Sequence, residues 1–108
     1  MGDRISISFK NGEDESVVFF SHWDGMELKG AVEKYVKELQ TGLNPNGVEP
    51  IDRLEPETVM VDFIRWYLKD SGRVEGNYYL GKNSEDGDNS DNGHWTFDLV
   101  KGKFAKRE

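Results

Sequence analysis

Apolar and polar residues alternate near the start of the chain. Residues 4–9 read Arg-Ile-Ser-Ile-Ser-Phe, which has the two-residue period of a strand with one buried face. The dipeptide Asn11-Gly12 follows, and it accommodates the positive φ of a tight turn. Residues 17–20 are continuously apolar, as in a strand buried on both faces. This pattern predicts a β-hairpin.

The apolar period lengthens to that of a helix after the hairpin. Asp24 is placed to cap a first helix together with Glu27 three residues later, and Gly42 is placed to end it. The predicted apolar stripe of this helix consists of Leu28, Ala31, Val32, Tyr35, Val36 and Leu39.

A second helix is predicted after the loop at residues 43–54. Pro56 suits its first position, because the missing N–H of proline would be unpaired there in any case, and Ser71-Gly72 ends it. Val61 and Trp66 widen its apolar stripe, and so we expect this helix to be the more buried of the two. The main stripe consists of Val59, Met60, Phe63, Ile64, Tyr67 and Leu68.

Two short strands are predicted near the end of the chain, at residues 78–80 and 95–99, on either side of the polar loop 82–93. The order of elements is then ββααββ. We expect an α+β fold with an antiparallel sheet of about four strands and two helices packed on one face. Residues 1–102 are expected to form a single α+β domain, and the basic residues 103–108 a frayed tail.

Composition narrows the class of protein. The chain has 108 residues, of which 35% are hydrophobic, and this suffices for the core of one domain. The net charge of −7 disfavours nucleic acid and anionic membranes as partners. Cysteine is absent, which excludes disulfides, thiolate metal sites and cysteine nucleophiles. We expect neither a leader nor a membrane span, and a cytoplasmic protein without a cofactor.

The segment before the first helix carries a resemblance. Residues 17–25 read Val-Val-Phe-Phe-Ser-His-Trp-Asp-Gly, and they resemble a family of small uncharacterised proteins of phages, bacteria and archaea. In that family an apolar strand, a His-Trp-(Asp or Gly)-Gly signature and an amphipathic helix precede a second helix and a short terminal hairpin. The resemblance implies this order of elements and carries no established activity. Loop 82–93 is longer and more acidic than the family pattern.

The His-Trp-Asp-Gly corner is a first candidate site. His22 has the chemistry of a general base or ligand, with Asp24 to orient it. The structural alternative, which we favour, makes Asp24 a helix cap, lets Gly25 ease the turn and places Trp23 at the end of the core.

The last predicted strand is a second candidate. His94, Thr96 and Asp98 share one face of it, and Ser6 and Ser8 lie on the corresponding face of the first strand. If these strands are neighbours, their polar side chains form a patch that suits a small polar ligand. The alternative, again favoured, is an ordinary solvated sheet face.

The acidic loop imitates the first half of a calcium site. Asp88, Ser90 and Asn92 supply oxygen donors at the first, third and fifth positions, and Gly93 stands at the sixth. Leu99 occupies the twelfth position, where a bidentate glutamate is needed, and so we expect a mobile loop with at most weak calcium binding. A joint metal site of the two His-Trp pairs has no support in their spacing.

Motifs of known chemistry are missing. The sequence has no phosphate-binding glycine loop, no His-Glu-x-x-His zinc motif and no nucleophile elbow. We therefore expect a non-enzymatic protein whose partner is another protein, and the resemblance implies an accessory protein of phage or mobile-element type. The alternative is a small-molecule or metal-ion binding domain that uses either candidate site. The sequence favours no oligomeric state.

Overall fold

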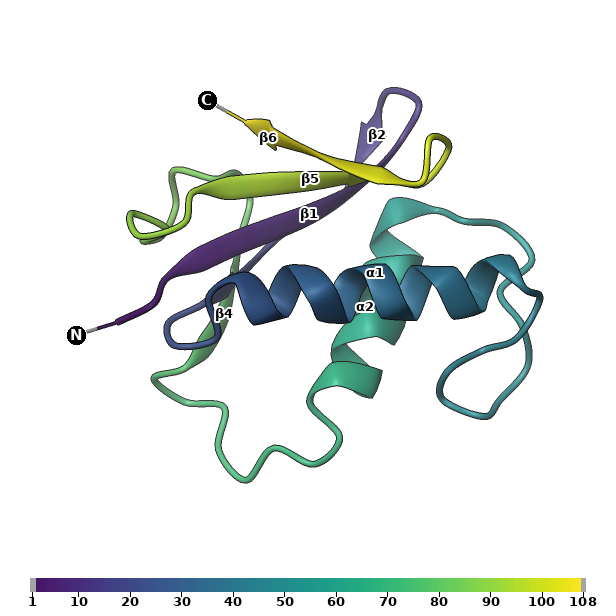
Figure 1. Cartoon of the computed structure of the whole chain (residues 1–108), viewed down its shortest axis with the longest axis horizontal. Coiled ribbons are helices and arrows are strands. Elements are labelled where there is room, and N and C mark those ends of the chain that lie inside the picture. The colour runs from purple at the N-terminus through teal and green to yellow at the C-terminus, as the bar shows by residue number, and fades with distance from the viewer. Residues whose placement is uncertain (1, 108) are drawn as a thin grey trace.

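The structure is a computed structural model that describes residues 2–107. Within these residues, the chain forms one α+β unit with two helices and six strands (Figure 1). The elements are β1 (Ile5–Asn11), β2 (Asp14–Glu15), β3 (Val18–Ser21), α1 (Met26–Gln40), α2 (Pro56–Tyr67), β4 (Tyr78–Gly81), β5 (His94–Asp98) and β6 (Lys103–Arg107). Neither helix has the length and apolar composition that crossing a bilayer requires.

The sheet is mixed, and its strand order is β4-β3-β1-β5-β6, with the short β2 paired to β1. β1 and β5 run parallel, and the other neighbours run antiparallel. The α+β class and the two helices are confirmed, but the expected antiparallel sheet of about four strands is wrong in strand number and direction. Alternation along a strand fixes the face of each side chain and leaves the neighbouring strand and its direction open.

Residues 103–107 differ from the expected frayed tail, whose last residue, 108, lies outside the described residues. Residues 103–107 form β6, which pairs with β5 from Lys103 opposite Asp98 to Arg107 opposite His94. Phe104 packs edge-on against Phe97, with ring centroids 5.0 Å apart, and this apolar contact holds the strand to the sheet.

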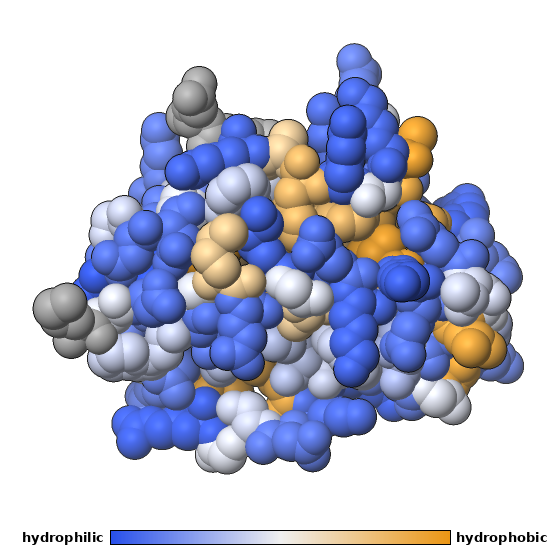
Figure 2. Space-filling view, in the orientation of Figure 1, coloured by the Kyte–Doolittle hydropathy of each residue, from blue (hydrophilic) through white to orange (hydrophobic). Residues whose placement is uncertain are grey.

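Both helices cover the same face of the sheet, as Figure 1 shows. Phe63 of α2 lies at the centre of the core, and its ring is 5.8 Å from that of Phe9 and 5.4 Å from that of Tyr35. Val61 was expected to widen the buried stripe, but it is 69% exposed, because it lies two residues before Phe63 and so on the opposite side of the helix. Figure 2 shows a mostly hydrophilic surface, with apolar side chains gathered where the C-terminal hairpin meets α1.

Candidate functional site

The face of the sheet opposite the helices carries the polar residues of β1 and β5. Their parallel pairing places Ser6 opposite His94 and Ser8 opposite Thr96, so these strands are the neighbours that a shared polar patch requires. All four residues are at most 5% exposed, and the patch is therefore a buried polar cluster instead of a solvated face.

The buried cluster is internally hydrogen-bonded. The imidazole of His94 contacts Ser6 Oγ through Nδ1 at 2.8 Å and Ser8 Oγ through Nε2 at 3.2 Å. Ser8 Oγ donates to Glu15 Oε2 at 2.8 Å, and Asn89 Nδ2 from the acidic loop donates to Ser6 Oγ at 2.8 Å. In a nucleophilic triad the serine hydroxyl is accessible and gives its proton to the imidazole. Here both hydroxyls are fully buried, which fits a structural network.

Charged side chains alternate across the same face, next to this cluster. Glu15, Lys10, Asp98 and Lys103 stand opposite one another on β2, β1, β5 and β6. Opposite charges on directly paired strands attract each other, so this row stabilises the pairing of the sheet. The outermost member of the row is Lys103, which places a positive charge on the edge strand β6.

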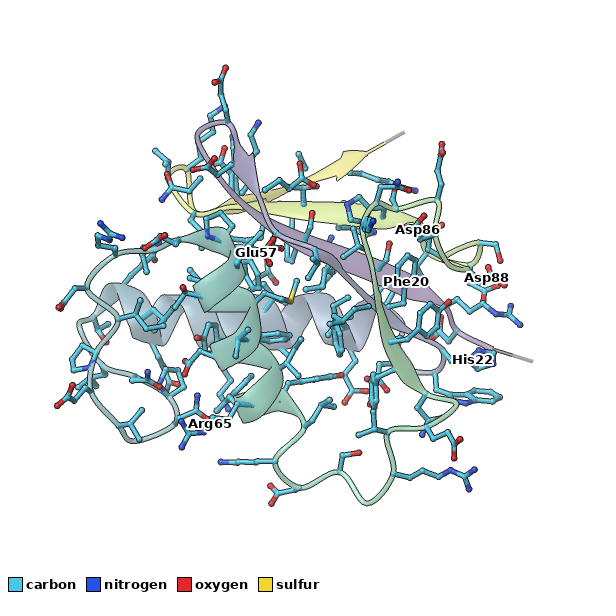
Figure 3. The ribbon with its side chains drawn as sticks, turned by 180° about the vertical axis from the view of Figure 1, so that it is seen from behind. Phe20, His22, Glu57, Arg65, Asp86 and Asp88 are labelled. Atoms are coloured by element: carbon cyan, nitrogen blue, oxygen red, sulfur yellow. The ribbon has the colours of Figure 1, made fainter. Side chains whose placement is uncertain are left out.

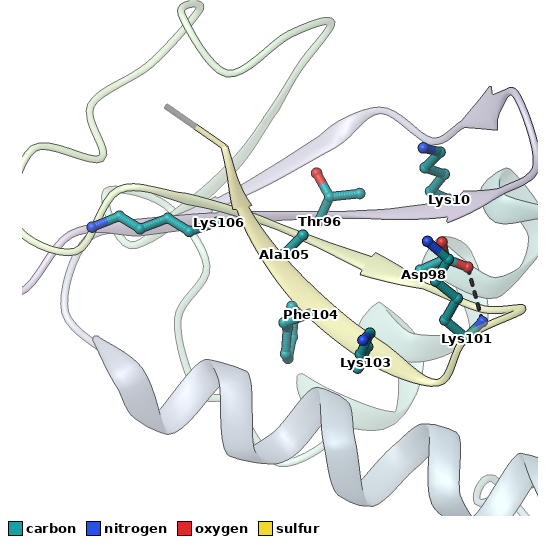
Figure 4. A pocket seen from close by; sticks show the side chains of 8 residues that line it. All are labelled: Lys10, Thr96, Asp98, Lys101, Lys103, Phe104, Ala105 and Lys106. Carbon is teal, nitrogen blue, oxygen red and sulfur yellow. Dashed lines mark hydrogen bonds between the residues drawn. The ribbon is translucent and has the colours of Figure 1, made fainter.

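A concave pocket of about 240 Å³ lies on this charged row, between β1 and the C-terminal hairpin (Figure 4). Its lining consists of Lys10, Thr96, Asp98, Lys101, Lys103, Phe104, Ala105 and Lys106. Four lysines and one aspartate give this lining a formal charge of +3, whereas the whole chain carries −7. We call it the lysine pocket.

The cations of the lysine pocket are only partly compensated within the described residues. Lys10, Lys101 and Lys103 form no direct ion pair with a carboxylate there, although the charges of Lys101 and Lys10 act on Asp98. The ammonium of Lys106 lies 5.5 Å from the ring centroid of Trp95, so this lysine contributes mainly its stem to the pocket wall.

Asp98 is the single acidic residue of the lysine pocket. Its Oδ1 accepts hydrogen bonds from the backbone N–H of Lys101 at 3.0 Å and of Val100 at 2.9 Å. The hydrogen bond from Lys101 is the main cause that lowers the pKa of Asp98 below its usual value. The carboxylate therefore stays charged and holds the β5–β6 turn in place.

The His-Trp-Asp-Gly corner has a different geometry from the expected helix cap. Gly25 stands at the N-cap of α1, and no side chain caps the helix. The carboxylate of Asp24 instead accepts hydrogen bonds from the hydroxyls of Tyr67 at 2.5 Å and Tyr78 at 2.7 Å. Burial, and after it the hydrogen bond to Asp24, raise the pKa of both tyrosines, that of Tyr78 to about 12.

The other two residues of this corner do not form a site with Asp24. Trp23 is 53% exposed, and the expectation that it fills the end of the core is wrong. The ring of His22 lies edge-on to Trp23, 4.5 Å between centroids, and its backbone N–H donates to Asn77 O. Within the described residues the imidazole of His22 forms no hydrogen bond with Asp24, whose carboxylate accepts those of the two tyrosines.

The acidic loop is organised by an arginine. Arg4 Nε lies 3.1 Å from Asp88 Oδ2, and Arg4 Nη1 lies 3.3 Å from Asp91 Oδ2. Asp88 Oδ1 accepts the backbone N–H of Ser90, and Asn92 Nδ2 donates to Arg4 O. A guanidinium thus stands beside the donors proposed for calcium, and no group of three or more His, Asp or Glu in residues 2–107 is arranged to hold a metal ion.

The same loop covers the end of the sheet next to β4. Figure 3 shows Phe20, Asp86 and Asp88 together on this side of the molecule. The backbone at Gly87 approaches Phe20 and Tyr79 so closely that a Cβ there would lie within 2.8 Å of both rings. Phe20 and Tyr79 are stacked with centroids 4.8 Å apart, and so the loop closes an aromatic pair against the sheet.

Sequence reasoning missed the lysine pocket. It assigned the basic residues 103–108 to a frayed tail and gave Lys10 no role. The available signal was the two-residue period, because Lys10 continues the face of Ser6 and Ser8, and Asp98 continues that of His94. Their meeting depends on the parallel pairing of β1 and β5, which that period does not specify.

Comparisons with protein-family models, with curated proteins and with solved structures find no match for this chain. Of the sites considered, the lysine pocket alone combines a concave surface, accessible charge and an outer strand of the sheet.

Proposed function

We propose that the protein is a small non-enzymatic interaction protein that binds an acidic, extended segment of a partner protein along β6. The observation that carries this proposal is the lysine pocket, because it gathers cations without ion-pair partners in a chain of opposite net charge. The resemblance of residues 17–25 adds that the partner complex is of phage or mobile-element type.

The position of β6 supports the binding of an extended segment. It is the last strand on its side of the sheet, and within residues 2–107 it pairs with β5 alone. A free strand edge presents backbone N–H and C=O groups to which a partner strand can be added. The added strand would gain main-chain hydrogen bonds, and the side chains on its outer face would meet Lys103.

Charge selects which segment binds. Basic segments would meet the cations of the lysine pocket and be repelled, whereas acidic side chains would be attracted. The net charge of −7 opposes an acidic partner at long range, but screening reduces this repulsion beyond about 8 Å at physiological salt. Local complementarity at β6 therefore decides the binding.

The buried cluster supports a role without catalysis. The hydroxyls of Ser6 and Ser8 and the imidazole of His94 are at most 4% exposed, and they are hydrogen-bonded to each other. Glu15 and Asn89 occupy hydrogen-bonding positions on the two serine hydroxyls, where a substrate would have to bind. Their role in the proposal is to hold β1 and β5 together below the binding surface.

Binding of a defined peptide tests the proposal. The probe is a short fluorescein-labelled peptide in which valine and glutamate alternate, and the measurement is fluorescence anisotropy. We expect saturable binding that weakens as salt is added. The double variant Lys101→Gln, Lys103→Gln should bind about three- to tenfold more weakly. A peptide with lysine in place of glutamate should not bind.

The matched control is the double variant Lys37→Gln, Lys82→Gln. It has the same net charge as the test variant, −7 − 2 = −9, and both of its lysines are exposed outside the lysine pocket. The control should bind the acidic peptide with affinity close to that of the unmodified chain. Equal losses in both variants would show a general charge effect and refute a site at β6.

A further inference from the structure

We infer that the lysine pocket is a phosphate subsite, which takes the phosphoryl group of a phosphorylated serine or threonine in the bound segment. This inference rests on the proposed function, because the phosphate arrives on the acidic segment that lies along β6. It specifies the chemistry of one side chain of the partner and the place on this protein where that side chain binds.

The size of the pocket fits one small group. Its volume of about 240 Å³ is below the roughly 300–1,000 Å³ of pockets that enclose drug-sized ligands. A phosphoryl group on a short side chain can enter such a pocket while the backbone of its segment remains at the outer strand.

The charge of the lining favours a dianion. Lys10, Lys101 and Lys103 outweigh Asp98 by two formal charges, because the ammonium of Lys106 lies near Trp95, and Asp98 stays ionised because backbone N–H groups hold its carboxylate. A glutamate side chain brings one negative charge, whereas a phosphoserine brings about 1.5 to 2 and three acceptor oxygens. The larger charge compensates the pocket better, and its oxygens can be shared among several cations.

The type of cation also fits a tetrahedral anion. The lining contains lysines and no arginine, and a lysine ammonium is a point charge with three donors on a flexible stem. Lys10, Lys101 and Lys103 come from β1, from the hairpin turn and from β6, so they approach the pocket from different sides (Figure 4). Such donors can surround a phosphate without the planar geometry that an arginine–carboxylate pair requires.

The surroundings favour a single phosphate over a nucleic acid strand. Glu13, Asp14 and Glu15 form the neighbouring β1–β2 turn and strand, and Asp98 lies within the pocket. Successive phosphates of a nucleic acid would meet these carboxylates, whereas one phosphoryl group on a peptide avoids them. The partner we infer is therefore a phosphorylated protein segment.

Substitution of Lys10 can distinguish the phosphate subsite from the rest of the binding surface. It lies on β1, two strands inward from β6, and reaches the pocket only across β5. A peptide bound along β6 contacts Lys101 and Lys103 whether or not it is phosphorylated, but Lys10 contacts a group that enters the pocket. Removing the charge of Lys10 should therefore weaken the binding of the phosphorylated peptide most.

Three peptides of one sequence test the inference by calorimetry at constant ionic strength. Valine and glutamate alternate in each, and the central residue is phosphoserine, serine or glutamate. We expect the phosphoserine peptide to bind about tenfold more tightly than the glutamate peptide. Lys10→Gln should weaken the phosphoserine peptide more than the glutamate peptide and so reduce this ratio towards one. Lys82→Gln, the matched control, should keep the ratio.

Each other outcome has a definite meaning. Equal affinities for the phosphoserine and glutamate peptides would refute the phosphate subsite and leave the proposed function intact, whereas failure of all three peptides to bind would refute both. Inorganic phosphate that binds as tightly as the phosphopeptide would assign the pocket to the free ion and overturn the inferred partner. Tighter binding of an oligouridylate that Lys10→Gln weakens would assign it to nucleic acid and likewise overturn the inference.

Discussion

Asp24 and Tyr67 lie 43 residues apart in the chain, and the tyrosine hydroxyl donates a hydrogen bond of 2.5 Å to Asp24 Oδ2. Tyr78 donates a second hydrogen bond to the same oxygen. One carboxylate therefore joins the connection between β3 and α1 to the end of α2 and to the start of β4. This role is tertiary, and it replaces the helix cap that the sequence suggests.

Replacing Asp24 should therefore destabilise the whole domain. Asp24→Ala removes the acceptor of two partly buried hydroxyls, and we expect the free energy of unfolding to fall by about 2–3 kcal/mol. Asp24→Asn keeps an acceptor oxygen and should lose less. Denaturation in urea, followed by circular dichroism, measures these differences.

The control for this prediction is Asp70→Ala. Asp70 is exposed in the turn after α2, and its carboxylate accepts no hydrogen bond within the described residues, so its removal should change the stability little. If Asp24→Ala and Asp70→Ala were equally stable, the two tyrosine hydrogen bonds would contribute nothing and the tertiary role would be refuted.

The tyrosines of this corner predict a loss of stability in alkali. Burial, and then the hydrogen bond and the charge of Asp24, raise the pKa of Tyr78 from 10.0 to about 12. Because the folded state holds this proton more tightly than the unfolded state, the stabilisation is complete below pH 10 and is lost as the pH rises to 12. Guanidinium titrations across this range should show a shallower decline for Tyr78→Phe. An unchanged slope would contradict the raised pKa.

The helices were predictable because a period of 3.6 residues persists over three turns or more in each of them. Val32, Tyr35 and Phe63 are buried as their spacing indicates. The direction of β5 beside β1 was not predictable, because a strand of five residues carries only its alternation. The same limit concealed β6, in which Phe104 is the single apolar residue that packs on the core.

The candidate sites were likewise predictable only in the features that follow from the local sequence pattern. The shared face of His94, Thr96 and Asp98 follows from alternation, and the structure places these residues beside β1. The burial of His94 and Thr96 does not follow, because it depends on covering residues from distant parts of the chain. The capping role of Asp24 failed because Gly25, at φ +57°, takes the N-cap position and leaves the carboxylate to Tyr67.

Two glycines with positive φ provide a matched pair of substitutions. Gly12 has φ +65° and open space around it, whereas a Cβ on Gly25, at φ +57°, would lie 2.1 Å from Asp3 Oδ2. Gly12→Ala should lower the free energy of unfolding by about 1 kcal/mol, the cost of the left-handed backbone alone. Gly25→Ala should lose about 1–2 kcal/mol more, since Asp3 must also move. Thermal and urea denaturation of both variants measure the difference. Equal losses would show that the Asp3 side chain moves aside without an energetic cost.

Arg4 is predicted to hold the acidic loop against β1. Arg4→Gln removes the ion pairs with Asp88 and Asp91, while the backbone of residues 82–93 keeps its contacts with Phe20. Exposed ion pairs contribute little to global stability, so the expected effect is local opening of the loop. Hydrogen exchange read by mass spectrometry should therefore quicken in residues 82–93 and stay unchanged in α1. Arg53→Gln, which removes the local ion pair with Glu55, is the matched control and should leave the loop unaffected. Exchange that remains slow in Arg4→Gln would show that packing over Phe20 holds the loop without the arginine.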